Sequence, residues 1–266
     1  EKIYEIIERK RGSFRPANPI QEALGRIIVS ADAAHSLGAS RHGVSTGRLS
    51  DFSSFSFHAV KNLTTAEGGA LTWRRIPGVD SELVYQQLRL LCSHGQTADA
   101  LDKAKTGSWA YDIIHPWYKH NLTDLAAALG LSQLQRYPEM LSRRREIIRR
   151  YDEAFLPLGV VSLPHETAES RSSGHLYICR VPGITQEQRN ALFAEMAQRG
   201  ISCNVHYIPL PMLTAYRTMG FRIEDFPNAF AFFSSEITLP LHTRLTDAEV
   251  DYIISAFSDL VRKYVA

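Results

Sequence analysis

The stretch SFSFHAVKNLTTAEGGAL, Ser54–Leu71, is the most informative part of this sequence. A single lysine, Lys61, lies between a Ser/Phe/His run and a run of small and polar residues that ends in Gly68 and Gly69. Most lysines are solvated surface charges. The aromatic residues before this one and the glycines after it favour a second interpretation, an amine in a partly desolvated crevice. There its pKa falls and it becomes a nucleophile.

Strand-like and helical patterns alternate on both sides of Lys61. An apolar run at 26–30 is typical of a short buried strand in a parallel sheet, and further strands are expected at 51–57 and 68–73. Their alternation with helical segments predicts an α/β layer architecture. Helical periodicity covers 1–12, 18–26, 81–95, 123–137 and 139–155.

The pattern changes after about residue 160. Helices are expected at 185–200 and 246–265, each opened by a capping box, Thr185 with Gln188 and Thr246 with Glu249. This segment reads as a compact α+β unit that can bury its own core. We therefore expect two domains, 1–155 and 156–266. Strands of the second domain are expected at 175–181, 201–207 and 236–241.

Composition excludes several classes of protein. The chain of 266 residues has 30 Lys and Arg against 28 Asp and Glu, so no strong field favours nucleic acid or an anionic membrane. No apolar run reaches the roughly 20 residues of a membrane helix. Three widely spaced cysteines form no CxxC pair, which favours a reducing cytoplasm. The arginine run 143–145 could be a phosphate patch, but a solvated helix face is the better interpretation.

Polar residues near Lys61 suggest a binding site. Asp32 follows the first apolar run, and α/β sheets bind ligands at the carboxyl ends of their strands. The same aspartate could equally be a turn residue or a helix cap. Ser53, Ser54 and Ser56 supply hydroxyls that could hold a phosphate. The segment 96–120 has no clear period and is expected to be a long functional excursion.

The motifs ADAAHSLGA and FSFHAVKNLTTAEGGAL closely resemble the DegT/DnrJ/StrS family of sugar aminotransferases. KHNLTDLAAALGLSQLQR resembles the next block of that family, and HLYICRV, NVHYIPL and ITLPLH resemble landmarks of its small domain. The resemblance implies fold type I of the pyridoxal-phosphate enzymes. That fold has a large domain with a mostly parallel sheet and a small α+β C-terminal domain. The chain begins directly in a helical pattern, so we expect that an N-terminal part of the large domain is missing.

The resemblance also implies roles for residues around Lys61. Lys61 would hold pyridoxal 5′-phosphate as an internal aldimine and shuttle the proton of the reaction. Asp32 would keep the pyridine nitrogen protonated, and His35 would approach the ring hydroxyl, unless it is simply a packed histidine. Ala34 would give the cofactor a small surface to lie against, and Ser56 would donate to its phosphate.

Further residues carry implied roles at a dimer interface and at the substrate entrance. Asn121, with Lys119 as a less secure companion, would reach the phosphate of the neighbouring subunit's cofactor in a homodimer with shared active sites. His206 and Tyr207 would lie near the substrate entrance, although structural packing explains them equally well. No metal site is expected.

The resemblance implies an aminotransferase that moves an amino group from glutamate or glutamine to a nucleotide-linked keto-sugar, in amino-sugar or polysaccharide biosynthesis. A lysine at position 61 favours transamination, because relatives with histidine there carry out dehydration. Two alternatives stay open. One is transamination of a keto-cyclitol or another non-nucleotide ketone, and the other is a non-catalytic relative on the same fold.

Overall fold

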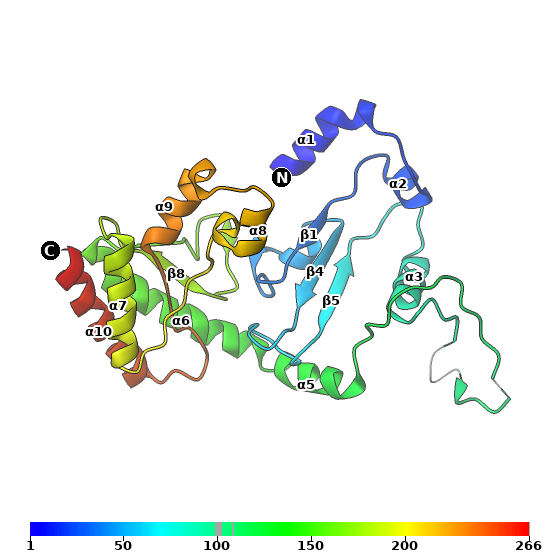
Figure 1. Ribbon diagram of the computed structural model, residues 1–266. Helices are drawn as coiled ribbons and strands as arrows, with labels where there is room; N and C mark the ends of the chain where they lie inside the picture. The colour runs from blue at the N-terminus through cyan, green and yellow to red at the C-terminus, as the bar shows by residue number, and fades with distance from the viewer. Residues whose placement is uncertain (99–102, 108, 266) are drawn as a thin grey trace. The chain divides into compact units, whose positions relative to one another are not determined.

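The computed structural model describes residues 1–98, 103–107 and 109–265. Their contacts divide the chain into two compact units, 1–37 with 44–135, and 38–43 with 136–266 (Figure 1). The long helix α6 (Tyr137–Phe155) lies wholly in the second unit, because its residues Ile147, Tyr151 and Phe155 belong to the C-terminal hydrophobic core. The predicted assignment of 1–155 and 156–266 to a large and a small domain stays a prediction.

The first unit is built on a mixed three-stranded sheet with the order β1-β4-β5 (Figure 1). β1 (Ser30–Asp32) is parallel to β4 (Phe52–Ser56), as predicted, whereas β5 (Gly69–Trp73) returns antiparallel to β4. The excursion that begins at Ser93 comes back along itself through isolated bridges Ser93–Lys119 and Gln96–Ile113, while 99–102 and 108 lie outside the described residues. The remaining elements of this unit are α1 (Lys2–Lys10), α2 (Pro19–Leu24), β3 (Val44–Ser45), α3 (Ser81–Cys92) and α5 (Asp124–Leu134).

The strand predicted at 26–30 is wrong in its bounds. Pairing begins only at Ser30, and Ile27 is 54% exposed rather than buried. The segment before the strand is held instead by the side chain of Asp51, which accepts two hydrogen bonds from Arg26, at 2.7 and 2.8 Å, and one from the Val29 amide at 2.8 Å. Burial opposes the ionisation of Asp51, but these donors outweigh it and lower the pKa of the carboxyl.

The second unit packs helices against a small antiparallel sheet of order β6-β8-β9 (Figure 1). The predicted strand at 175–181 is present as β8 (Tyr177–Arg180), and that at 236–241 as β9 (Glu236–Leu239). Both predicted capping boxes form, at Thr185 and at Thr246. The other elements are β2 (Ser40–Arg41), β6 (Val161–Ser162), β7 (Ser170–Arg171), α7 (Gln186–Gln198), α8 (Thr214–Thr218), α9 (Pro227–Ser235) and α10 (Asp247–Val265).

The strand predicted at 201–207 does not form. Asn204 alone pairs with Thr238 of β9, through hydrogen bonds of 3.0 and 2.8 Å between their backbones. The Asn204 side chain accepts from the next amide, Val205, and so competes with further ladder bonds. The segment therefore lies along β9 without becoming a regular strand.

The solvated face predicted for the arginine run on α6 is wrong at its centre. Arg144 is 7% exposed and donates to the carbonyls of Gly174, His175 and Leu241, at 3.0, 3.2 and 3.1 Å. One guanidinium thus satisfies three carbonyls from two loops. Burial lowers the pKa of Arg144, whose guanidinium donates to these carbonyl oxygens.

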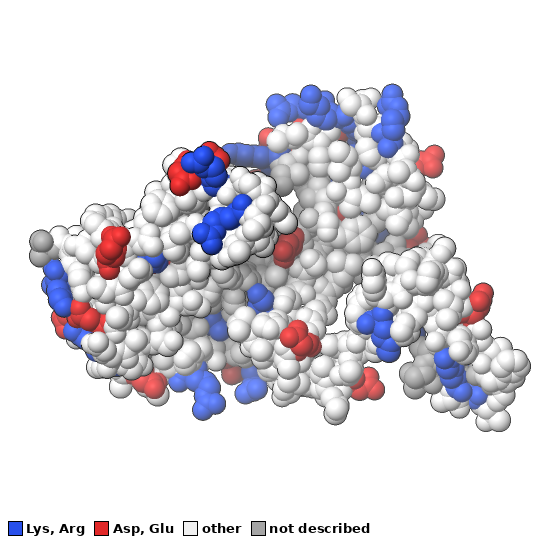
Figure 2. Space-filling model, in the orientation of Figure 1, with Lys and Arg blue, Asp and Glu red and all other residues white. Residues whose placement is uncertain are grey.

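Charges elsewhere show little segregation. On the face drawn in Figure 2, basic and acidic side chains are interspersed. In the part of the chain that the structure describes, no helix has both the length and the apolarity needed to cross a bilayer. Nor does any cluster of three or more His, Cys, Asp or Glu side chains suited to a metal occur among those residues.

Replacing Arg144 with alanine should destabilise the second unit. The change leaves three carbonyls in the protein interior without their hydrogen-bond donor, so we expect a loss of roughly 3 kcal/mol in the free energy of unfolding. Urea unfolding measures it. Arg149→Ala is the matched control on the same helix, because Arg149 pairs with Glu153 on an exposed face and should change stability by less than about 0.5 kcal/mol. Equal effects of the two substitutions would show that the Arg144 hydrogen bonds to the three carbonyls do not stabilise the second unit.

Candidate active site

The parallel pairing of β1 with β4 builds one edge of the candidate site. It aligns Asp32 with Ser54, and both side chains are exposed at the carboxyl end of the pair. Asp32 is fixed by a turn directly after the strand. Its Oδ1 accepts from the Ala34 amide at 3.0 Å, and the Ala33 amide donates to the Ser54 carbonyl at 2.8 Å. Asp32 is therefore a turn residue, and its side chain is also exposed at the carboxyl end of β1.

The His35 ring lies within electrostatic reach of both Lys61 and Asp32. Burial and the positive charge of Lys61 lower the pKa of His35, and the negative charge of Asp32 opposes them. The lowered pKa of His35 favours the neutral imidazole. The three residues expected to surround the cofactor ring are thus brought together in the first unit.

The loop that carries Lys61 connects β4 to β5 and is closed by its own backbone. The Phe57 amide donates to the Gly68 carbonyl and the Thr65 amide donates to the Phe57 carbonyl, both at 2.8 Å. Gly68 has a φ of +151°, and a Cβ there would lie 2.4 Å from Thr65 Oγ1. Only glycine fits this return, which explains why the glycine run follows the lysine.

Helix α5 holds the same loop from outside. The Gln133 side chain accepts from the Thr64 amide at 3.1 Å, and its Nε2 donates to the Thr64 carbonyl. The side-chain amide thus pairs with both backbone groups of Thr64, as a neighbouring strand would. Sequence reasoning missed this residue. Helical spacing puts Gln133 on one face with Gly130, where a Cβ would lie 3.0 Å from Thr65 Cγ2, but no local pattern indicates which loop that face meets.

The serines of β4 divide between the two faces of the sheet. Ser54 and Ser56 alternate with Ser53, so they project to the opposite side. Ser56 is half-buried, and its hydroxyl accepts from the His58 amide at 3.3 Å. Ser53 is fully buried, bonded to Ser50 and to the Thr46 carbonyl, so the suggestion that it could hold a phosphate is wrong.

The two alanines after Asp32 are small and tightly placed. Ala33 is 1% exposed, and Ala34 is half-buried in the turn. This placement suits the predicted role of Ala34 as a flat surface beside a ligand.

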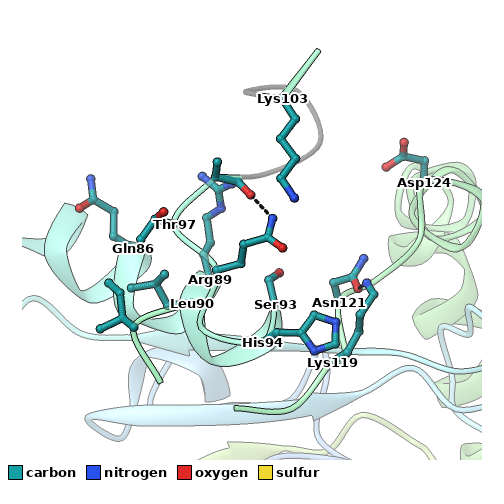
Figure 3. A pocket seen from close by; sticks show the side chains of 13 residues that line it. Gln86, Arg89, Leu90, Ser93, His94, Thr97, Lys103, Lys119, Asn121 and Asp124 are labelled. Atoms are coloured by element: carbon teal, nitrogen blue, oxygen red, sulfur yellow. Dashed lines mark hydrogen bonds between the residues drawn. The ribbon is translucent and has the colours of Figure 1, made fainter. Parts of the chain in front are cut away.

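Asn121 and Lys119 lie in a pocket of about 890 Å³ at the end of α3 (Figure 3). Arg89 and Lys103 also contribute positive charge to its lining, and Asp124 negative charge. The Lys119 ammonium donates to the Asn121 side chain. The two residues predicted to reach a phosphate therefore act as one polar pair within the first unit.

His206 and Tyr207 belong to the second unit. The His206 ring is half-buried, and its Nδ1 lies 2.9 Å from the hydroxyl of Thr238. Tyr207 is 64% exposed and its ring meets the His206 ring edge-on, with centroids 4.8 Å apart. Packing accounts for part of the His206 environment, while Tyr207 is presented to solvent.

Comparison with known proteins identifies the family to which this chain belongs. The sequence profile described as the DegT/DnrJ/EryC1/StrS aminotransferase family matches residues 20–258. The chain therefore belongs to the DegT/DnrJ/EryC1/StrS aminotransferase family. The resemblance inferred from the motifs is confirmed, and so is the α/β fold of pyridoxal-phosphate-dependent sugar aminotransferases.

Similar proteins include curated sequences and solved structures. Spore coat polysaccharide biosynthesis protein SpsC of Bacillus subtilis is 35% identical over 242 residues, which is 89% of this chain and 60% of SpsC. The sugar aminotransferase Spr1654 of Streptococcus pneumoniae, solved in a PMP form, is 50% identical with a TM-score of 0.91. That match covers 98% of this chain and 66% of the other. Helicobacter pylori PseC, described as an aminotransferase of pseudoaminic acid biosynthesis, is 27% identical with a TM-score of 0.74, over 90% of this chain and 60% of PseC. This chain spans about 60% of the length of the curated relatives that it matches.

Replacing Gln133 with alanine should loosen the Lys61 loop. Both backbone groups of Thr64 lose their partner, which costs roughly 1–3 kcal/mol. Hydrogen exchange read by mass spectrometry should be faster in the peptide that covers 57–68. Gln135→Ala, an exposed neighbour on the same helix end, is the control and should leave that peptide unchanged. Unchanged exchange in the Gln133 variant would show that the loop closes without α5.

Proposed function

We propose that the protein is a pyridoxal-phosphate-dependent aminotransferase acting on a nucleotide-linked keto-sugar, with glutamate or glutamine as amino donor. The observation that carries the proposal is the grouping of Asp32, His35 and Lys61 at the carboxyl end of β1 and β4. Family membership supports the reaction class, and the role of SpsC in spore coat polysaccharide biosynthesis supports a sugar substrate. We place the reaction in the cytoplasm, in amino-sugar biosynthesis.

The residues present fit pyridoxal phosphate. An exposed carboxylate, a half-buried amine and a hydroxyl from a neighbouring strand offer what its ring nitrogen, aldehyde and phosphate each require. Asp32, Lys61 and Ser56 supply these groups, and His35 and Ala34 border them. When bound, the cofactor supplies an electron sink for the pair of electrons left as a proton leaves the substrate carbon.

The residues of this chain then hold and move protons. Asp32 keeps a proton on the ring nitrogen by placing a negative charge beside it. The Lys61 amine, which would be linked to the cofactor aldehyde before substrate arrives, takes up and returns the proton of the substrate carbon. A neutral His35 fits this arrangement, because a second cation beside Lys61 would oppose its protonation. His206 and Tyr207 are proposed to contact the substrate.

Lys61→Arg should abolish turnover while keeping the positive charge. Arginine cannot form the covalent link or return the proton, so we expect a loss of about 10³-fold or more. Reduction with borohydride in the presence of pyridoxal phosphate, followed by peptide mass mapping, should label Lys61 in the unmodified protein only. Lys263→Arg, in an exposed ion pair with Glu195, is the control. A label on another lysine would overturn the assignment.

We also propose that the protein is a homodimer in which Asn121 and Lys119 serve the neighbouring subunit's site. Variants Lys61→Arg and Asn121→Ala should each have low activity alone. After mixing and subunit exchange, one site of each mixed dimer regains both residues, so activity should rise to about a quarter of that of the unmodified protein. A mixture that stays as inactive as its parents would place Asn121 in its own subunit's site. Size-exclusion chromatography with light scattering checks that exchange and dimerisation occurred.

A further inference from the structure

A buried polar chain in the second unit ends on the His206 ring. Glu236 is fully buried on β9, and Thr238, two residues further, projects from the same face of the strand. The Thr238 hydroxyl donates to Glu236 Oε1 at 2.6 Å and lies 2.9 Å from His206 Nδ1. The series of hydrogen bonds therefore runs from the Glu236 carboxylate through the Thr238 hydroxyl to the His206 imidazole.

The second oxygen of Glu236 is also engaged. The backbone amide of His206 donates to Oε2 at 3.2 Å, so both carboxylate oxygens accept hydrogen bonds. Arg189, 2% exposed, donates to the backbone carbonyl of Glu236 at 2.9 Å and sets a positive charge beside it. Burial raises the pKa of Glu236, while the two donors and Arg189 oppose that rise. Two acceptor bonds and a buried countercharge match an ionised carboxylate.

Counting the protons along this series of hydrogen bonds determines the tautomer of the His206 imidazole. A hydroxyl has one hydrogen, and that of Thr238 goes to Glu236. Toward His206, the hydroxyl can then only accept, so the proton of the neutral ring sits on Nδ1 and the lone pair on Nε2. We propose that Glu236 and Thr238 are positioning residues that hold His206 in its Nδ1–H tautomer, so that Nε2 accepts a hydrogen bond from a hydroxyl or ammonium group of the substrate.

The proposal predicts that replacing one carboxylate oxygen of Glu236 with an amide nitrogen switches the tautomer of the His206 ring. In Glu236→Gln, the amide oxygen has to face the His206 backbone amide, which can only donate. The amide nitrogen then faces Thr238 and donates to it, so the threonine hydroxyl turns and donates to Nδ1. The proton of His206 moves to Nε2, and the ring presents a donor where it had an acceptor.

Nitrogen-15 NMR of the histidine rings reads this directly in the purified protein. Long-range proton–nitrogen correlations distinguish the two tautomers, and His206→Gln assigns the signal by its loss. At pH 8 we expect Nδ1–H in the unmodified protein and in Thr238→Ser, which keeps the hydroxyl, and Nε2–H in Glu236→Gln. An Nε2–H ring in the unmodified protein, or no reversal in Glu236→Gln, would overturn the proposal.

The substrate part of the proposal rests on the proposed function and has its own readout. With a keto-sugar substrate, Glu236→Gln and Thr238→Val should raise KM about tenfold with little change in kcat, as expected when one hydrogen bond used in binding is lost. Thr238→Ser should behave as the unmodified protein. An unchanged KM would remove His206 from substrate recognition. If the unmodified protein and all variants lack turnover while Glu236→Gln still switches the tautomer, the proposed function is contradicted and the tautomer assignment stands.

Discussion

The parallel pairing of β1 with β4 is the constraint on which the first unit depends. It is anchored at one end by Asp51, which binds the Arg26 guanidinium with both oxygens and the Val29 amide with one. This anchor sets which residues of the two strands lie side by side, and a slip of one residue would turn the Asp32 side chain to the other face. Because the pair is in register, Asp32 emerges beside Ser54, and the loop that leaves β4 brings Lys61 within electrostatic reach of His35. The position of Asp32 at one end of the pair thus depends on a partly buried ion pair at the other.

The loop after β4 shows how hydrogen bonds can hold a loop that carries a functional candidate, here Lys61. Loops expose backbone groups that water competes for, and they open more easily than strands. Here the loop bonds to itself at Phe57, Thr65 and Gly68, and Gln133 of α5 covers the backbone of Thr64. Lys61 therefore sits on a loop whose base has the hydrogen bonding of a sheet edge. A backbone held in this way fixes the position of the Lys61 Cα, which suits the proton transfer proposed for its amine.

Sequence patterns predicted the regular elements whose signals are local. The capping boxes at Thr185 and Thr246 formed because each depends on residues three apart, and β4, β5, β8 and β9 formed where strand-like runs were expected. The errors have non-local causes. The Val29 amide is bound by the side chain of Asp51, distant in the sequence, and Arg144 is buried because two remote loops present carbonyls to it. Lys61, the proposed catalytic lysine, was found through its motif, whereas residues that hold its loop, such as Gln133, carry no motif of their own.

The two units solve the same physical problem in similar ways. A side chain that is to act on a ligand needs one orientation, yet a polar group gains little net stability from a hydrogen bond that water could also provide. Both units therefore place the orienting groups where water is excluded: the Gln133 amide against a half-buried threonine backbone, and the Glu236 carboxylate at zero exposure behind Thr238. Burial raises the cost of leaving these groups unpaired, so alternative arrangements become less favourable than the observed one. An inward-facing charge such as Glu236 weakens a purely apolar core, and its place in the core is explained if it determines which atom of His206 carries the proton.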